Sequence, residues 1–317
     1  MPVPAIFDRL RLPVIGAPLF IVSNPDLVIA QCKSGIVGSF PALNARPQSQ
    51  PDEWIHQITE ELAAHDRDHP EEPSAPFAVN QIVHRSNDRF EEDMTTCAKW
   101  RVPIVITSLG AREDLNHAVH DWGGITLHDI IDDRYAHKAI DKGADGIIAV
   151  AAGAGGHAGK WSPFALVQEI RKWFDGPLIL SGAIATGGAV LAAQAMGADF
   201  AYIGSPFIAT PEARATEEYK QAITEGGAAD IVTSALFTGV SGNYLRASIL
   251  AAGLNPDELP SPGPDAMNFQ SATGAKAWRD IWGSGQGIGV VDKVRPAAEL
   301  IDRLAREYGD ARRRLSL

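Results

Sequence analysis

Residues 143–150, GADGIIAV, and residues 197–204, GADFAYIG, repeat the pattern that decides the fold of this chain. In both, a Gly-Ala-Asp turn follows a helical stretch and leads into a short apolar run. Glycine at the C-cap is a common helix end, and near-continuous apolar runs are typical of parallel strands that are covered on both faces. The repeat therefore predicts β–α–β units.

The same alternation continues along most of the chain. We expect strands at residues 14–19, 36–40, 77–83, 104–107, 124–127, 146–150, 178–181 and 200–204. We expect helices between them at residues 25–33, 52–64, 89–100, 114–121, 132–142, 163–174 and 188–196, with Pro163 in the first turn of its helix. Eight units within about 205 residues favour a TIM (β/α)8 barrel over an open doubly wound sheet.

The pattern changes after residue 204. Residues 211–235 predict one or two helices, residues 253–274 form a Gly/Pro-rich irregular region, and residues 294–308 form an amphipathic helix. We therefore expect a barrel made of residues 1–210 and 290–317. A mostly helical insertion, residues 211–289, would lie between strand eight and its helix as a lid over the barrel mouth.

Composition narrows the function classes. A net charge of -11 over 317 residues disfavours a nucleic-acid partner, and the basic run 312–314 reads as a solvated tail. No apolar run is long enough to cross a membrane and no signal peptide is evident, so a cytoplasmic location is expected. The two cysteines, Cys32 and Cys97, are expected to be buried on helices, and no residue set has metal-ligand spacing.

Active sites of TIM barrels lie at the carboxyl ends of the strands, so the turns after strands seven and eight matter most. Ser181, Gly182 and Ala183 follow strand seven, and Gly204 and Ser205 follow strand eight. Such turns can bind a phosphate through backbone N–H groups. Glycines at strand ends also serve simply as the turns of any barrel, and the pattern alone leaves both interpretations open.

The loop after strand six, residues 151–160, reads AAGAGGHAGK and places His157 among glycines. Glycines that include Gly155 and Gly156 would let the backbone lie flat against a planar ligand, with the imidazole projecting over it. The alternative is a flexible turn whose histidine is incidental. The absence of Ser, Asn and Asp favours the functional interpretation.

Several spaced motifs carry a resemblance to a known family. GADGIIAVAAGAGGHAG, LILSGAIATGGAVLAAQAMGADFAYIGSPF, VIGAPLF and WGSGQGIG together resemble the FMN-dependent nitronate monooxygenases, also called 2-nitropropane dioxygenases. The resemblance implies a TIM barrel with FMN at its mouth and the FMN phosphate at the loops after strands seven and eight. It implies His157 as the active-site histidine.

The resemblance also assigns other residues. Ala17, Pro18 and Leu19 would back the flavin ring, and Asn80 would reach the ring or the ribityl chain. Gly155, Gly156, Ser181, Gly182, Ala183, Gly204 and Ser205 complete the implied cofactor site. Apart from the resemblance, His84 and His128 fall at strand ends, and these two residues, with Tyr244 and Gln286, are candidates for substrate contact.

The chain departs from the family pattern at four positions: Val150, Gly153 and Ala158 stand where the family has Gln, Glu and Arg, and Asp129 stands near the usual Lys. These changes are expected to alter flavin electronics. The resemblance leads to the first hypothesis, oxidation of alkyl nitronates or nitroalkanes with O2. The departures leave open the alternative, an NAD(P)H-dependent flavin reductase acting on an enoyl thioester or quinone. A third hypothesis is a non-catalytic flavin-binding barrel. A homodimer is possible.

Overall fold

Eight parallel strands form one sheet in the order β1-β9-β8-β6-β5-β4-β3-β2 in this computed structural model, which describes residues 3–260 and 278–316. An isolated parallel bridge joins Ile15 to Val37, and the Gly16 N–H donates to the Val37 carbonyl at 2.7 Å. This bridge links β1 to the chain entering β2 and closes the barrel. The strands are β1 (Val14–Gly16), β2 (Gly38–Pro41), β3 (Phe77–Ile82), β4 (Ile104–Ser108), β5 (Ile125–Ile130), β6 (Gly146–Val150), β8 (Leu178–Ser181) and β9 (Phe200–Ile203). The TIM barrel predicted from the sequence is confirmed.

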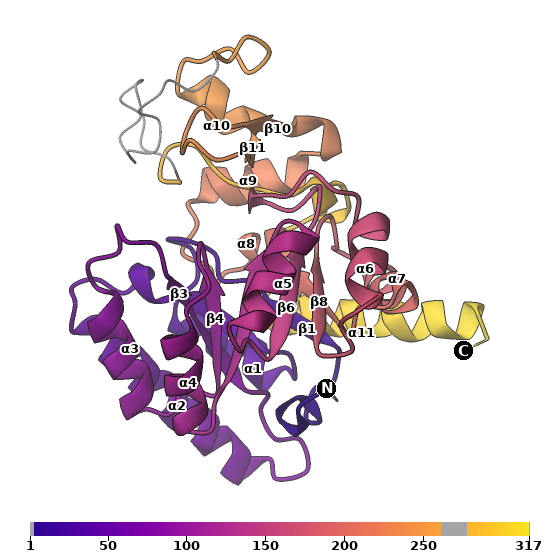
Figure 1. Cartoon of the computed structure of the whole chain (residues 1–317). Helices are drawn as coiled ribbons and strands as arrows, with labels where there is room; N and C mark the ends of the chain where they lie inside the picture. The colour runs from indigo at the N-terminus through magenta and orange to yellow at the C-terminus, as the bar shows by residue number, and fades with distance from the viewer. Residues whose placement is uncertain (1–2, 261–277, 317) are drawn as a thin grey trace.

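Helices surround this barrel and connect its strands (Figure 1). They are α1 (Pro25–Lys33), α2 (Gln50–Asp68), α3 (Phe90–Lys99), α4 (Glu113–Asp121), α5 (Asp133–Asp141), α6 (Pro163–Arg171) and α7 (Gly187–Met196). Local sequence sets their ends as predicted: Pro163 opens α6, and Gly197, at φ +113°, ends α7 in the left-handed conformation that favours glycine. Short 3-10 turns η1 (Ala5–Phe7) and η2 (Ala42–Asn44) complete this part.

The barrel interior is filled by alternate side chains of the strands. Ile104, Ile106, Leu127 and Phe200 belong to this inner cluster. Ile130 belongs instead to the cluster between the strands and the helices. Because side chains alternate along a strand, this register sends residue 129 inward and residue 128 toward the helices.

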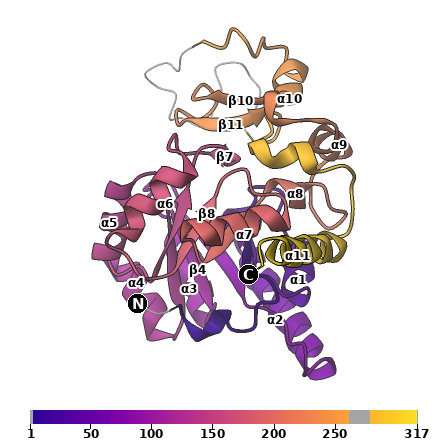
Figure 2. The same ribbon diagram turned by 90° about the vertical axis from the view of Figure 1, so that its right-hand side faces the viewer.

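The eighth helix of the ring is α11 (Ala297–Arg314), which returns after the insertion and packs against α7 and α1 (Figure 2). The approach to α7 is close, since a Cβ at Gly187 would lie 2.1 Å from the Leu304 carbonyl oxygen. The helix runs beyond the predicted residues 294–308. The basic residues 312–314 are exposed as expected, but they form the last turn of α11 rather than a tail, where their charge complements the helix dipole.

The chain between β9 and α11 forms a smaller layer over the barrel mouth (Figures 1 and 2). It contains α8 (Ser205–Ile208), α9 (Glu217–Glu225), η3 (Ala228–Asp230), β10 (Ile231–Ser234), β11 (Gly242–Leu245), α10 (Arg246–Ala251) and η4 (Gln286–Val290). The helical prediction for residues 211–235 holds for α9 and is wrong for residues 231–234, which pair with β11 as a strand. Residues 261–274 of the predicted irregular region lie outside the described residues.

A three-stranded antiparallel sheet, β10-β11-β7, joins this layer to the barrel. Its third strand is β7 (Gly156–His157), which belongs to the loop after β6. The register pairs Gly242 with His157 and Asn243 with Gly156. The glycine-rich loop is therefore part of a sheet with the insertion, an arrangement that the sequence did not predict.

Both cysteines are buried on helices as expected, Cys32 on α1 and Cys97 on α3. Burial raises the pKa of each thiol to about 12, so both stay protonated and unreactive at neutral pH. Within residues 3–260 and 278–316 no helix has the length and apolarity to span a bilayer. In the same residues, no three His, Cys, Asp or Glu side chains gather as a metal site would require.

Candidate active site

A cavity of about 1500 Å³ lies between the carboxyl ends of the strands and the insertion, where TIM-barrel enzymes keep their active sites. Its floor is the last inward-facing layer of the barrel, and its roof comes from the β6 loop and the insertion. Floor residues that line it include Asn80, Ser108, Asp129, Val150, Ser181 and Tyr202, and roof residues include His157 and Trp278.

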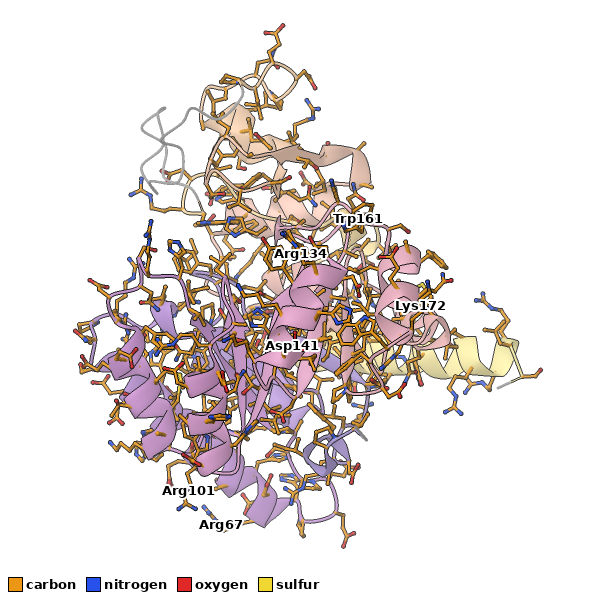
Figure 3. All side chains as sticks on the ribbon, viewed as in Figure 1. Arg67, Arg101, Arg134, Asp141, Trp161 and Lys172 are labelled. Carbon is orange, nitrogen blue, oxygen red and sulfur yellow. The ribbon has the colours of Figure 1, made fainter. Side chains whose placement is uncertain are left out.

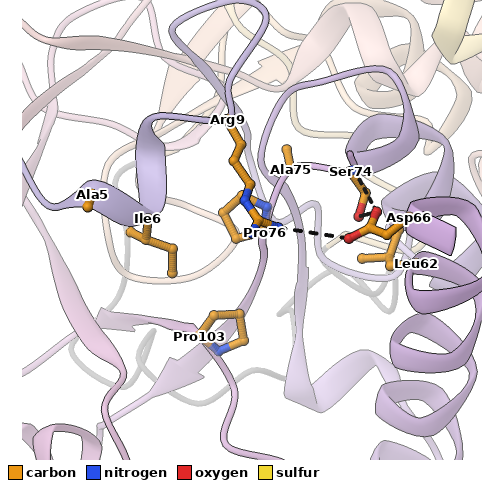
Figure 4. Close-up of a pocket in the computed structure, with 9 residues that line it drawn as sticks. All are labelled: Ala5, Ile6, Arg9, Leu62, Asp66, Ser74, Ala75, Pro76 and Pro103. Atoms are coloured by element: carbon orange, nitrogen blue, oxygen red, sulfur yellow. Dashed lines mark hydrogen bonds and ion pairs between the residues drawn. The ribbon is translucent and has the colours of Figure 1, made fainter. Parts of the chain in front are cut away.

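A second, smaller pocket of about 380 Å³ lies near the other end of the barrel (Figure 4). Pro76 and Pro103 line it, just before β3 and β4 begin. Asp66 accepts hydrogen bonds from the Ser74 N–H and hydroxyl at 2.7 and 2.6 Å, and its carboxylate lies 3.8 Å from Arg9 Nη1. These polar groups satisfy one another, so the pocket presents no reactive group. Arg67 and Arg101 lie at this same end of the molecule (Figure 3).

The residues predicted to hold a cofactor converge on one side of the large cavity. Gly182 and Ala183 have φ +139° and +55°, so the chain makes a sharp turn as it leaves β8. A Cβ at Gly204 would lie 3.1 Å from Leu19 Cδ2 and 3.4 Å from Ala17 Cβ, so the turn after β9 lies directly against the β1 loop. The predicted cofactor residues Ala17, Pro18, Leu19, Asn80, Gly155, Gly156, Ser181, Gly182, Ala183, Gly204 and Ser205 all line the cavity.

A chain of hydrogen bonds crosses the floor. Asn80 Nδ2 donates to Ser108 Oγ at 2.8 Å, and the Ser108 hydroxyl donates to Asp129 Oδ2 at 2.6 Å. Burial raises the pKa of Asp129 to about 6, against the lowering effect of the Ser108 hydrogen bond. Burial and the negative charge of Asp129 also raise the pKa of Tyr202, which stays neutral.

His157 stands in the roof and is half-buried. Its Nε2 lies 3.0 Å from Thr238 Oγ1, and the ring makes an edge contact with Trp278 at 5.3 Å between centroids. Burial lowers its pKa below the ordinary histidine value, so the imidazole is neutral at pH 7. A neutral imidazole held at one nitrogen can accept a proton at the other.

The glycines of the loop have a different structural reason from the expected one. A Cβ at Gly155 would lie 2.7 Å from the Gly285 backbone nitrogen, and a Cβ at Gly159 would lie 2.3 Å from the Val150 carbonyl oxygen. Protein backbone, rather than a planar ligand, therefore occupies the space beside these two residues. The loop needs glycine there because it packs tightly against the barrel and the insertion.

Of the four predicted substrate contacts, two line the cavity. His84 does so with its Nδ1 2.8 Å from Ser86 Oγ. His128 lines the edge of the cavity, but its side chain lies on the face of β5 that is turned toward the helices, with Nδ1 2.5 Å from Thr107 Oγ1. Burial, together with the charge of Lys138, lowers the pKa of His128 to about 4.

The other two are not among the residues that line the cavity, and their contact with substrate stays a prediction. Tyr244 is fully buried, with its hydroxyl 3.5 Å from Thr238 Oγ1 and its ring 5.5 Å from the Trp278 ring, so it supports the roof from behind. Gln286 is exposed, and its backbone N–H donates to the Gly153 carbonyl at 2.9 Å.

The structure shows what surrounds three of the positions that depart from the family pattern. Val150 lines the floor. Gly153 has φ +86°, and a Cβ there would lie 3.0 Å from Gln286 Oε1, so the Gln286 amide stands beside the position where the family has Glu. The Ala158 N–H donates to the Ser241 carbonyl at 3.2 Å.

Sequence reasoning missed Thr238, Trp278 and Ser108. Thr238 and Trp278 come from the insertion, where no periodicity marked them. Ser108 could have been found, because it follows the inward residues Ile104 and Ile106 at strand spacing.

Comparison with known proteins identifies the family. The family model described as nitronate monooxygenase matches residues 7–307 of this chain. The chain belongs to the nitronate monooxygenase family. A nitronate monooxygenase of Paraburkholderia phytofirmans is 26% identical, over 93% of this chain and 92% of that protein. The resemblance stated from the motifs is confirmed, and the chain is a flavin-dependent oxidoreductase.

Solved structures agree on the fold. Nitroalkane oxidase from Streptomyces ansochromogenes matches with a TM-score of 0.81 at 24% identity, covering 98% of this chain and 100% of that one. The enoyl reductase domain of MlnA from Bacillus amyloliquefaciens matches with a TM-score of 0.68 at 14% identity, covering 97% of each chain. Both likenesses concern the barrel architecture, which enzymes of different chemistry share.

Proposed function

We propose that the flavin of this enzyme is FMN, bound in the large cavity. The Gly182–Ala183 and Gly204–Ser205 turns would hold the phosphate through backbone N–H groups, as barrels do after their last strands. The apolar segment 17–19 would back the ring, and the Asn80 amide would offer a polar contact from the floor. The residues fit such a ligand, because both turns line the cavity. The turn after β9 lies against the β1 loop, and the turn after β8 lies against Ala152, whose carbonyl oxygen would be 2.8 Å from a Cβ at Gly182.

We propose that the reaction is the oxidation of alkyl nitronates or nitroalkanes with O2 as acceptor. The observation that carries this proposal is His157, a neutral imidazole in the roof, opposite the floor on which the flavin would lie. FMN supplies the redox chemistry when bound. His157 would accept the α-proton of a nitroalkane, or donate a hydrogen bond to the nitro oxygens of a nitronate once protonated.

A second candidate function rests on the size of the cavity. At about 1500 Å³ it exceeds the roughly 300–1,000 Å³ usual for a single small ligand. Arg46, Lys138 and Arg279 line it. A cavity of this volume with basic side chains on its wall suits an NAD(P)H-dependent reductase that acts on a larger anionic substrate such as an enoyl thioester, or on a quinone.

One experiment separates the two. The purified protein is loaded with FMN, its visible spectrum is recorded under argon, and a nitronate or NADPH is added. Bleaching by the nitronate and not by NADPH is the expected result. Bleaching by NADPH alone supports the reductase, and a protein that takes up no FMN overturns the cofactor assignment.

The remaining expectations stay proposals. The barrel made of residues 1–210 and 290–317 would bind the cofactor, and residues 211–289 would act as the lid. A cytoplasmic location and a homodimer are also still predictions, which fractionation and light scattering would test.

A further inference from the structure

We propose that Asp129 is a proton-exchanging residue of the cavity floor, whose carboxylate takes up a proton when negative charge develops in the cavity above it. The proposal goes beyond the function proposed above, and only its flavin arm rests on that function. It concerns a residue of the cavity floor to which the proposed function assigns no role.

The register of β5 places this carboxyl inside the barrel. Ile125 and Leu127 pack in the inner cluster, so residue 129, next in the same alternation, faces inward and forms part of the floor. Asp129 pairs with Ile148 of β6 on one side. On the other side, Ser108 at the end of β4 reaches it through a hydrogen bond.

The hydrogen bonding of Asp129 is one-sided. Its Oδ2 accepts from the Ser108 hydroxyl, whose oxygen in turn accepts from Asn80 Nδ2. Because the single hydroxyl proton of Ser108 is directed at Oδ2, the other carboxyl oxygen, Oδ1, is the atom that can carry an added proton. Asn80 Nδ2 also donates to the Ile106 carbonyl at 3.2 Å, which fixes the direction of the chain.

In the part of the chain that the structure describes, no cation lies beside this carboxylate. Among residues 3–260 and 278–316, no Lys, Arg or His nitrogen lies within 4.0 Å of it. Asp129 is half-buried, and a partly desolvated carboxylate with one hydrogen bond from the protein and no cation beside it is costly, so protonation relieves that cost. The raised pKa of Asp129, about 6, agrees with this geometry.

Several other titratable groups face Asp129 or line the same cavity. Tyr202 faces it from β9 and stays neutral, while β6 and β8 present only Val150 and Ser181 to the cavity floor. The remaining titratable residues that line the cavity are His84, Arg46, Asp88, His128, Tyr135, Lys138, His157, Tyr219 and Arg279. The charge of Lys138 acts on His128, the outward-facing neighbour.

The proton balance follows from this placement. If a flavin bound in the cavity took up two electrons and one proton, the cavity would gain one net negative charge. That charge would raise the proton affinity of the Asp129 carboxylate, which would take a second proton from solvent and become a neutral carboxyl group. The electrons come from the oxidised substrate or the nicotinamide donor of the proposed function, and Asp129 itself is neither oxidised nor reduced.

The first test uses the full chain without cofactor. Carbon-13 NMR of the aspartate carboxyls is followed between about pH 4 and 9, because exposed aspartates titrate near 3.9. We expect one carboxyl with a midpoint near 6, absent in Asp129→Asn and moved to higher pH in Ser108→Ala. Asp141→Asn, an exposed aspartate on α5 (Figure 3), is the control and should leave that midpoint unchanged. A wild-type spectrum without such a carboxyl overturns the proposal.

The second test measures the reduction potential of the FMN-loaded enzyme against pH. At pH values above the midpoint of Asp129, the wild-type enzyme should take up two protons with two electrons, so its reduction potential should fall by about 59 mV per pH unit. Asp129→Asn should take up one proton, and its potential should fall by about 30 mV per pH unit. Equal slopes in the two proteins overturn the coupling between Asp129 and the cavity charge. Failure to bind FMN overturns the proposed function alone, because the NMR titration of the apoprotein still decides whether Asp129 exchanges a proton.

Discussion

His157 and Thr238 are 81 residues apart in sequence, yet His157 Nε2 lies 3.0 Å from Thr238 Oγ1. The loop after β6 supplies the imidazole and the insertion supplies the hydroxyl that orients it. Thr238 is buried and also donates its hydroxyl to the Val240 carbonyl at 3.1 Å, so its position is fixed by its own turn. The insertion is thus part of the site as well as its cover.

Replacing Thr238 by Val should lower turnover without removing the flavin. The change deletes the oxygen that holds Nε2 while keeping the side-chain shape, and a hydrogen bond of this kind is worth up to about tenfold. Steady-state kinetics with a nitronate measures the effect, which should fall on kcat more than on KM. Thr238→Ser keeps the hydroxyl and should retain most of the activity. If the Thr238→Val enzyme had the same kcat and KM as the wild type, the orienting role would be contradicted.

Replacing His157 by Ala should abolish most of the activity towards nitroalkanes, by about 10²–10⁴-fold if the imidazole acts as general base. The FMN spectrum should stay close to that of the wild type, because the predicted phosphate turns lie on other loops. The matched control is His137→Ala, which removes an exposed histidine that is stacked on Trp173 at 3.7 Å and is not among the residues that line the cavity. Full turnover by His157→Ala would rule out the base.

The pH profile of nitroalkane oxidation should show the lowered pKa of His157. The neutral imidazole is the active form, and burial disfavours its protonation. Activity should therefore persist on the acid side to a lower pH than an ordinary histidine of about 6.5 would allow. The check is kcat/KM against pH, compared with Thr238→Val; an acid limb above the ordinary histidine value would contradict the assignment.

Substituting Gly155 by Ala should destabilise the protein. Its Cβ would lie 2.7 Å from the Gly285 backbone nitrogen, which cannot move aside as a flexible side chain would. We expect a loss of about 1–3 kcal/mol in the free energy of unfolding, as for other overpacked sites. Thermal and urea denaturation measure it. Gly188→Ala is the control: its nearest neighbours are 3.9 Å away and it lies in α7, so alanine should be neutral or stabilising.

Asp129→Asn should stabilise the protein more at high pH than at low pH. The folded-state pKa of Asp129 is raised from 3.8 to about 6, so the folded protein binds this proton more tightly than the unfolded chain does. Below about pH 4 the carboxyl is protonated in both the folded and the unfolded protein, and the folded state is not penalised. As pH rises through 6 the folded protein must ionise this group, and the free energy of unfolding falls by about 3 kcal/mol. Urea unfolding at about pH 4 and 8 measures the difference, and a pH-independent effect of the substitution would contradict the sign.

Local sequence was sufficient for the barrel. The Gly-Ala-Asp turns, Pro163 and the apolar runs predicted the strands and helices, because each depends on neighbours within a few residues. The turns after β8 and β9 were likewise found as part of one site, since barrel geometry brings every strand end to the same rim. Tyr244 and Gln286 could not be assigned in this way, because no repeating pattern fixes their direction.

The sequence by itself determined the barrel, the family, the positions of Gly182 and Gly204 at strand ends, and the position of His157 in the loop after β6. Only the tertiary structure decided that β7 joins β10 and β11, that Thr238 holds His157, and that Asp129 faces the cavity while His128 faces the helices. Local preferences and the period of a strand are written in short windows of sequence. Pairing between distant strands and the burial of one charged group depend on how the whole chain closes, which no short window contains.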